Sequence, residues 1–171
     1  MSASKVSRIV VMGVSGCGKS TLAQALAQRL GLPFIEGDEL HPPRNVALMA
    51  TGTPLTDEDR SGWLQAIAAR LAAAQSTGAV VACSALKRCY RDVLRDGAPD
   101  LRLVHLSGSE SVLAQRMQAR TGHYMPATLL RSQLDTLQPP GADEHAVVLN
   151  IESPPEQMLA AICRQWDIPG A

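Results

Sequence analysis

A glycine-rich stretch near the N-terminus, GVSGCGKST, constrains the fold more than any other part of the chain. Gly13, Gly18, Lys19 and Ser20 fit the spacing G-x-x-x-x-G-K-[ST], with an apolar run just before them and a helical pattern after. A loop of this kind, between a strand and a helix, wraps phosphate groups with its backbone N–H groups. The stretch therefore predicts a phosphate-binding loop that follows a buried strand.

Apolar runs alternate with helical patterns along the rest of the chain. The expected strands are residues 8–13, 32–38, 78–84, 101–108 and 146–151, and the expected helices are 19–30, 57–75, 88–96, 109–120, 126–137 and 153–166, the last with Ser153 as N-cap. This alternation predicts an α/β fold with a five-stranded parallel sheet covered by helices on both faces. We expect one domain over residues 1–171, with a mobile lid at about 116–137 and ligands at the carboxyl ends of the strands.

The charge balance limits the possible partners. Sixteen basic and sixteen acidic side chains cancel, and aromatic residues make up only 3% of the chain, so we expect neither nucleic acid nor membrane as a partner. The four cysteines, Cys17, Cys83, Cys89 and Cys163, show no CxxC pair or zinc spacing, which predicts reduced thiols in the cytoplasm. The apolar run at the N-terminus is too short for a signal peptide, and no run has transmembrane length.

The phosphate-binding loop predicts ATP and Mg²⁺ as ligands. We assign ATP binding to Gly13, Val14, Ser15, Gly16, Cys17, Gly18, Lys19, Ser20 and Thr21. Lys19 supplies charge to the outer phosphates and Ser20 offers a hydroxyl to the metal. A GTPase would need an Asn-Lys-x-Asp motif, which is absent. Motor ATPases usually carry an apolar strand ending in Asp, whereas the third expected strand ends in Cys83-Ser84 and the fourth in Ser107. The sequence therefore favours a small phosphotransferase.

Polar residues follow the second and third expected strands and mark the acceptor side. In EGDELHPPRN (36–45), Asp38 can accept a hydrogen bond from an attacking hydroxyl, while Glu36 and Glu39 are expected to face water. The predicted substrate contacts are Asp38, His41 and Arg44 from this stretch, Ser84, Lys87 and Arg91 from CSALKRCYRD, and His123. The alternative for each of them is a solvent-exposed loop or helix surface.

Two arginines four residues apart, Arg116 and Arg120, share one face of the helix that precedes the expected lid loop. Such arginines can pair with phosphate oxygens when a lid closes and can shield the reaction from water. The alternative is ordinary surface charge. We predict Lys19, Asp38 and Arg120 as the catalytic residues.

Taken together, these blocks resemble the gluconokinases of the small P-loop type, related to shikimate and nucleoside monophosphate kinases. The resemblance rests on MGVSGCGKST, EGDELHPPRN, TGTPLTDEDRSGWL, CSALKRCYRDVLR, GHYMPATLLRSQLDTL and VVLNIESPPEQM. It implies phosphorylation of D-gluconate on its terminal hydroxyl by ATP, and a homodimer. It also implies that Arg116 lies against the adenine, that Arg120 reaches the phosphates, and that the loop at Ser153 and Pro154 lines the other side of the base.

Three positions depart from the family pattern. Leu48 stands where lysine is frequent, Gln138 where glutamate is frequent, and Tyr124 where phenylalanine is frequent. None of these changes is expected to alter the reaction class. Two other functions stay open: a kinase for another small hydroxy or sugar acid, and a nucleotide-binding switch without turnover.

Overall fold

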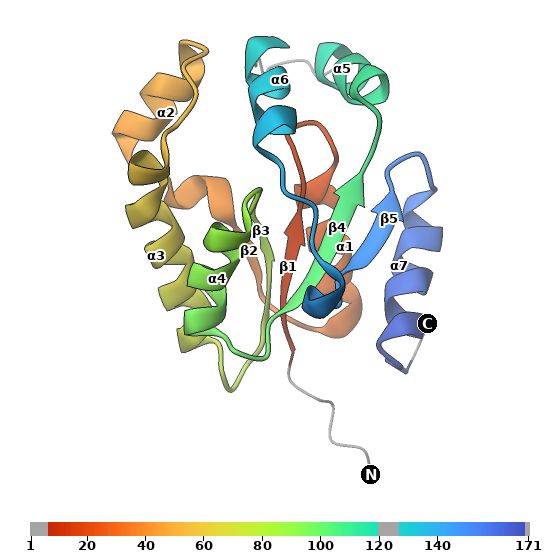
Figure 1. Ribbon diagram of the computed structural model, residues 1–171. Coiled ribbons are helices and arrows are strands. Elements are labelled where there is room, and N and C mark those ends of the chain that lie inside the picture. Colours follow the sequence, from red (N-terminus) through yellow and green to blue (C-terminus); the bar gives the residue numbers. More distant parts are fainter. Residues whose placement is uncertain (1–6, 120–126, 170–171) are drawn as a thin grey trace.

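The computed structural model describes residues 7–119 and 127–169, and its centre is a parallel sheet (Figure 1). The strands are β1 (Arg8–Met12), β2 (Phe34–Glu36), β3 (Ala79–Ala82), β4 (Arg102–Ser107) and β5 (Val147–Asn150). Their order is β2-β3-β1-β4-β5, and all neighbouring pairs are parallel. The predicted α/β fold with a five-stranded parallel sheet is confirmed.

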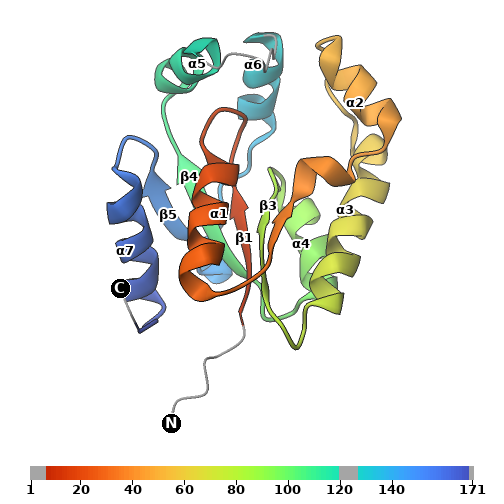
Figure 2. The same ribbon diagram turned by 180° about the vertical axis from the view of Figure 1, so that it is seen from behind.

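Helices cover both faces of this sheet. They are α1 (Lys19–Leu30), α2 (Pro43–Ala50), α3 (Asp57–Ala73), α4 (Arg88–Gly97), α5 (Glu110–Ala119), α6 (Ala127–Thr136) and α7 (Pro155–Gln165), with short 3-10 helices η1 (Gly37–Leu40) and η2 (Ala142–Glu144). Figure 2, seen from behind, shows α1 and α7 in front of the sheet, while α4 lies on the far side. Within the described residues, no helix combines the length and apolar character needed to cross a membrane.

Successive residues of β1 reach two separate cores, because strand side chains alternate between the faces of a sheet. Ile9 and Val11 pack in the core on the side of α1 and α7. Val10 and Met12 pack in the opposite core with Trp63 and other residues of α3 and α4. All five residues of β1 are buried, Arg8 included, and the apolar run at residues 9–12 predicted a buried strand.

The carboxyl ends of the strands meet at the upper edge of the sheet in Figure 1. Helix α2 stands at one side of this edge, and α5 and α6 stand together at the other. An ion pair between Arg131 of α6 and Glu110 of α5, 2.9 Å long, joins the latter two. The edge is therefore framed by helices that lie beyond the sheet, which is where the sequence led us to expect ligands.

Two local predictions need correction. Helix α2 was not predicted, because Pro42 and Pro43 suggested a loop; Pro43 is instead the first residue of the helix, where a missing N–H costs nothing. Ser153 was expected to cap α7, but Pro154 holds the N-cap position, and the Ser153 amide donates to the Asn150 carbonyl at 3.0 Å. Helix α1, by contrast, has the predicted bounds and ends at Gly31 in the left-handed conformation.

Candidate active site

The glycines of the loop between β1 and α1 divide into two kinds. A Cβ on Gly13 would lie 2.7 Å from the Cys17 Sγ, and one on Gly16 would lie 2.8 Å from the Met117 Cγ of α5, so these two glycines allow close packing. Gly18 has a φ of +90°, yet a Cβ there would meet nothing within 4 Å. The loop is thus compact on its inner side and open at Gly18, directly before the N-terminus of α1.

This open end suits an anion. The first turn of α1 carries no acidic residue, and no side chain caps its N-terminus in the described structure. Helix N–H groups without a partner, together with the positive end of the helix dipole, favour negative charge. Lys19 lies across the loop, with its Nζ donating to the Val14 carbonyl at 3.2 Å. The residues present therefore fit the phosphate groups of a nucleotide.

The carboxylate of Glu36, at the end of β2, accepts a hydrogen bond from the Ser20 hydroxyl. The prediction that Glu36 faces water is wrong: the residue is partly buried and joins the phosphate-binding loop to the acceptor segment. Hydroxyl and carboxylate oxygens are ligands that Mg²⁺ prefers. Among the described residues, no group of three or more His, Cys, Asp or Glu could hold a metal ion.

The turn after β2 is fixed from two sides at Gly37. The Trp63 indole N–H of α3 donates to the Gly37 carbonyl at 2.7 Å. A Cβ at this position would lie 2.3 Å from the Ala82 carbonyl oxygen at the end of β3, so only glycine fits. The Glu36 carboxylate also accepts from the Asp38 amide at 3.4 Å. The backbone that carries Asp38 is therefore held against β3, while Asp38 itself is exposed.

His41 stacks on Trp63, with ring centroids 4.0 Å apart and the planes 13° from parallel. Burial lowers the pKa of His41, although the nearby Asp38 carboxylate opposes the shift. The buried Asn45 of α2 places its Nδ2 3.2 Å from the His41 Nδ1 and donates to the Asp59 carbonyl at 2.8 Å. A neutral, oriented imidazole beside Asp38 can hydrogen-bond a polyhydroxylated ligand.

The remaining residues predicted from this stretch lie further out. Arg44 is 78% exposed and pairs with Asp59 at 3.5 Å, so its guanidinium can reach a ligand only from the rim. Glu39 is exposed, as predicted.

The turn after β3 brings Ser84 next to the phosphate-binding loop, because the Gly13 amide donates to the Ser84 carbonyl at 3.3 Å. Lys87 pairs with Asp57 at 2.9 Å, and Asp57 also accepts from the Tyr90 hydroxyl. These contacts hold the Lys87 ammonium between the N-termini of α3 and α4.

Arg91 does not face the acceptor side, and the prediction that it contacts substrate is corrected here. It is fully buried, and its guanidinium donates to the Glu144 carboxylate and to the carbonyls of Ala85 and Leu86. The charge of the guanidinium is paired and its N–H groups donate to protein oxygens, because a buried guanidinium without such partners would be costly.

Charges from three elements meet around Cys83, at the end of β3. The pKa of its thiol is raised to about 12, mainly by burial; the Asp38 and Glu36 carboxylates act in the same direction, while a backbone hydrogen bond with Ala85 and the Lys19 ammonium oppose the shift. The Ser20–Glu36 and Gly13–Ser84 hydrogen bonds bring the phosphate-binding loop, the turn after β2 and the end of β3 together at one place on the sheet edge.

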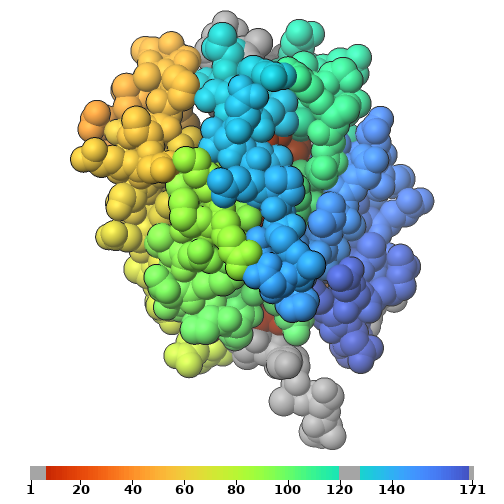
Figure 3. All heavy atoms as spheres, viewed as in Figure 1, coloured from red at the N-terminus to blue at the C-terminus, as the bar shows by residue number. Residues whose placement is uncertain are grey.

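Helices α5 and α6 contact the phosphate-binding side. The Arg116 guanidinium donates to the Ile151 carbonyl at 2.6 Å, which places it beside the loop that leads to Pro154. Arg116 therefore contacts a residue that lies three positions along the chain from Pro154, the other residue that the resemblance assigned to the base. Gln133 of α6 accepts a hydrogen bond from the Ser15 amide at 2.7 Å, a contact that the sequence did not predict. Figure 3 shows atoms of the red N-terminal segment between α5 and α6.

Two predicted site residues, Arg120 and His123, lie outside the described residues, as does Tyr124. The sequence reasoning also missed Glu36, Gly37 and Gln133. The spacing of Glu36 and Asp38 at a strand end could have indicated that both carboxylates belong to the site. No local signal marks Gln133, because its partner lies 118 residues away.

The sheet order, the glycine loop before α1 and the Ser20–Glu36 contact define a class, the P-loop nucleotide-binding phosphotransferases. A family model described as an AAA domain matches residues 9–140. The gluconokinase of Gluconobacter oxydans (strain 621H) is 49% identical to this chain over 160 residues, which cover 92% of this chain and 90% of that protein. This chain belongs to the gluconokinase family.

Solved structures agree with this family. An unliganded sugar kinase from Janibacter sp. HTCC2649 superposes with a TM-score of 0.91 at 46% identity and covers 96% of each chain. A gluconokinase from Sinorhizobium meliloti 1021 superposes with a TM-score of 0.86 at 51% identity and covers 94% of each chain. Both likenesses span nearly the whole chain, so they include both sides of the candidate site.

Proposed function

We propose that this protein transfers the γ-phosphoryl group of ATP to the terminal hydroxyl of D-gluconate and forms 6-phospho-D-gluconate. The observation that carries the proposal is the contact between Ser20 and Glu36, which joins the phosphate-binding loop to the acceptor segment. A kinase needs these two parts within reach of each other, because the acceptor oxygen must approach the γ-phosphorus in line with the leaving oxygen. Relatives named gluconokinase support the choice of acceptor.

On the phosphate side, the amides of residues 13–21 and the Lys19 ammonium bind the phosphate oxygens. Lys19 now donates to the Val14 carbonyl, and phosphate oxygens are stronger acceptors for it. Ser20 would hold Mg²⁺, with Glu36 beside it, and the ion supplies positive charge where phosphate charge develops. The nucleotide-binding P-loop family supports ATP and Mg²⁺ as the ligands.

On the acceptor side, Asp38 accepts the proton of the attacking hydroxyl. A bond forms between that oxygen and the γ-phosphorus, the bond from phosphorus to the β–γ bridging oxygen breaks, and ADP leaves with the electron pair. His41 and Ser84 hydrogen-bond the hydroxyls of gluconate, while Lys87 and Arg44 attract its carboxylate. Gluconate carries one carboxylate and several hydroxyls, which matches this mixture of cations and hydrogen-bonding groups.

The base of the nucleotide lies between Arg116 and the loop at Pro154, which are neighbours through the Arg116–Ile151 contact. We also propose that residues 116–137 act as a lid, that Arg120 contacts the phosphates and that His123 contacts the acceptor. A homodimer in the cytoplasm belongs to the same proposal, and light scattering coupled to gel filtration measures the oligomeric state.

The decisive experiment incubates the protein with ATP, Mg²⁺ and a panel of sugar acids and hydroxy acids, and measures ADP release. We expect gluconate to give the largest kcat/KM. A preference for another acid on the panel would establish the alternative kinase. ATP binding without acceptor-dependent ADP release would instead establish a nucleotide-binding switch.

A further inference from the structure

The turn from Ser84 to Arg88 has an unfavourable backbone. Ala85 has a φ of 46°, in the left-handed region that residues with a Cβ rarely adopt, and it is fully buried. Ser84 and Lys87, on either side of it, carry two of the proposed acceptor contacts. Other contacts must therefore hold the turn in this conformation, because strained backbone persists only where its surroundings enforce it.

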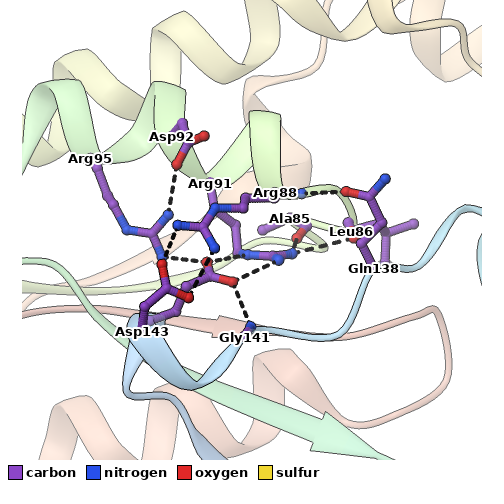
Figure 4. Close-up of polar contacts among 10 residues, drawn as sticks. Ala85, Leu86, Arg88, Arg91, Asp92, Arg95, Gln138, Gly141 and Asp143 are labelled. Carbon is purple, nitrogen blue, oxygen red and sulfur yellow. Dashed lines mark hydrogen bonds and ion pairs between the residues drawn. The ribbon is translucent and has the colours of Figure 1, made fainter.

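Arg91 supplies the first of these contacts. Its Nη1 donates to the Ala85 carbonyl at 2.9 Å and to the Leu86 carbonyl at 3.3 Å (Figure 4). The guanidinium is oriented in turn by Glu144 of η2, since Nε donates to Oε1 at 2.8 Å and Nη2 to Oε2 at 3.0 Å. Both side chains are 1% exposed.

Glu144 is itself held in place. It accepts from the Gly141 amide at 2.9 Å and from the Arg95 guanidinium. Burial works against the charged form, but these hydrogen bonds and those from Arg91 keep the pKa of Glu144 at about 2. The carboxylate is thus an ionised, fixed anchor throughout the pH range in which a cytoplasmic enzyme works.

Gln138 supplies the second contact with the turn. Its backbone N–H donates to the Leu86 carbonyl at 2.7 Å, and its Oε1 accepts from the Arg88 amide at 2.9 Å (Figure 4). The second bond caps the N-terminus of α4, where the N-cap residue Lys87 gives no side-chain cap. Figure 3 shows the blue segment that follows α6 lying directly against the green α4.

We infer that Glu144 and Gln138 are positioning residues for the acceptor: through Arg91, Leu86 and Arg88 they hold the turn that presents Ser84 and Lys87. The inference rests on the proposed function, because it assumes that the acceptor binds at this turn. A buried Arg–Glu pair is often no more stabilising than apolar residues of the same volume. The role of this pair is therefore to fix the conformation of the turn rather than to stabilise the fold. The same contacts tie this turn to the segment that begins at the end of α6.

The first test uses Gln138→Ala, which removes the cap on α4 without leaving a buried charge. We expect the KM for gluconate to rise about tenfold, the effect of one lost hydrogen bond, while the KM for ATP stays within about twofold. Gln138→Glu keeps the acceptor oxygen and should retain the KM values of the unmodified protein. The matched control is Asp143→Asn, which breaks the exposed ion pair with Arg88 in the same segment and should change neither KM.

The second test uses Glu144→Gln, which keeps the size of the side chain but leaves Arg91 without its counter-charge. We expect a larger rise in the KM for gluconate, again with the KM for ATP retained, in protein shown to be folded by circular dichroism. If this variant does not fold, the two Gln138 variants test the inference by themselves. Equal changes in both KM values, or a loss of thermal stability with both KM values unchanged, would overturn the inference.

The outcome for the unmodified protein separates this inference from the proposed function. If it turns over another acid better than gluconate, the proposed acceptor is wrong and the same KM comparison is made with that acid. If no acid on the panel is turned over, both the function and the inference are rejected. Turnover of gluconate with unchanged KM values in the Gln138 and Glu144 variants rejects the inference alone.

Discussion

Asp38 is an exposed carboxylate on a rigid piece of backbone. Its amide is bound by Glu36 and its neighbour Gly37 by Trp63. The Asp38 side chain is exposed, so a ligand can approach its carboxylate. The residues around Asp38 thus provide the burial and the fixed contacts, and under the proposed function Asp38 itself provides the base.

The substitution Asp38→Asn should lower kcat by about 100-fold or more while the KM for ATP is retained, because general-base catalysis contributes about 10²–10⁴ in rate. Steady-state kinetics with gluconate and ATP measures both constants. Glu39→Gln, at the exposed neighbouring carboxylate, is the control and should leave kcat unchanged. A kcat within about threefold of the unmodified value in Asp38→Asn would show that Asp38 is not the base.

The cysteines should react unequally with alkylating reagents. Cys89 is exposed, whereas Cys17, Cys83 and Cys163 are buried. Burial also raises the pKa of Cys83 to about 12, so its reactive thiolate is scarce at neutral pH. We expect iodoacetamide to modify the native protein once, at Cys89, and the unfolded protein four times, as measured by intact mass. Cys89→Ser should abolish the native modification, and rapid labelling of Cys83 would contradict the structure.

At the scale of elements, the sequence signals at the N-termini of helices explain which helices were predicted correctly. Helices α1 and α3 begin at recognisable signals, a glycine loop and a Thr-x-x-Asp capping box, and both were predicted within two residues. Helix α2 lacks such a signal. Pro42 and Pro43 are equally compatible with a turn, and only the contacts of Asn45 with His41 and Asp59 show why a short helix forms there.

The capping box of α3 should contribute measurably to stability. The Thr56 hydroxyl accepts from the Asp59 amide at 3.1 Å, and the Asp59 carboxylate accepts from the Thr56 amide at 2.9 Å. Thr56→Ala should lower the free energy of unfolding by about 1 kcal/mol, seen as a Tm lower by about 2–4 °C. Ser61→Ala, an exposed hydroxyl within the same helix, is the control and should not lower the Tm.

At the scale of the whole molecule, the five parallel strands followed from the sequence, but the buried ion pairs did not. Short apolar runs that alternate with helical patterns are typical of buried parallel strands. The contact of Arg91 with Glu144, however, joins residues 53 apart in the sequence, and neither carries a local sign of its partner. Sequence reasoning therefore identified the P-loop fold, and the acceptor stretch that it proposed stays a prediction, yet it placed the buried Arg91 among the substrate contacts.

Acid should destabilise the fold, and the protonation of His105 should set the pH range in which it does so. This residue of β4 is buried, its Nε2 has no hydrogen-bond partner in the described residues, and burial together with Arg91 lowers its pKa. Above about pH 6.5 the imidazole is neutral in both the folded and the unfolded chain, so His105 does not reduce the free energy of unfolding there. As the pH falls below that value, the unfolded chain takes up the proton first, so the free energy of unfolding decreases.

Urea unfolding between pH 5 and 8 would measure this slope. His105→Leu should reduce it, although not abolish it, because burial lowers the pKa of His41 as well. His145→Asn is a matched control at an exposed histidine in the left-handed conformation, which asparagine tolerates, and should keep the slope. An unchanged slope in His105→Leu would mean that other groups cause the acid sensitivity.

Gly37 has a consequence for attempts to change the acceptor by directed evolution. With only 2.3 Å between an added Cβ and the Ala82 carbonyl, any side chain at this position would push the end of β2 away from β3 and carry Asp38 with it. A library that randomises His41, Arg44 and Leu48 while keeping Gly37 would vary residues of the proposed acceptor side and leave the Asp38 carboxylate in place. In such a library, variants gain new substrates by changing side chains on an unchanged backbone, and variants with a substitution at Gly37 are expected to be inactive.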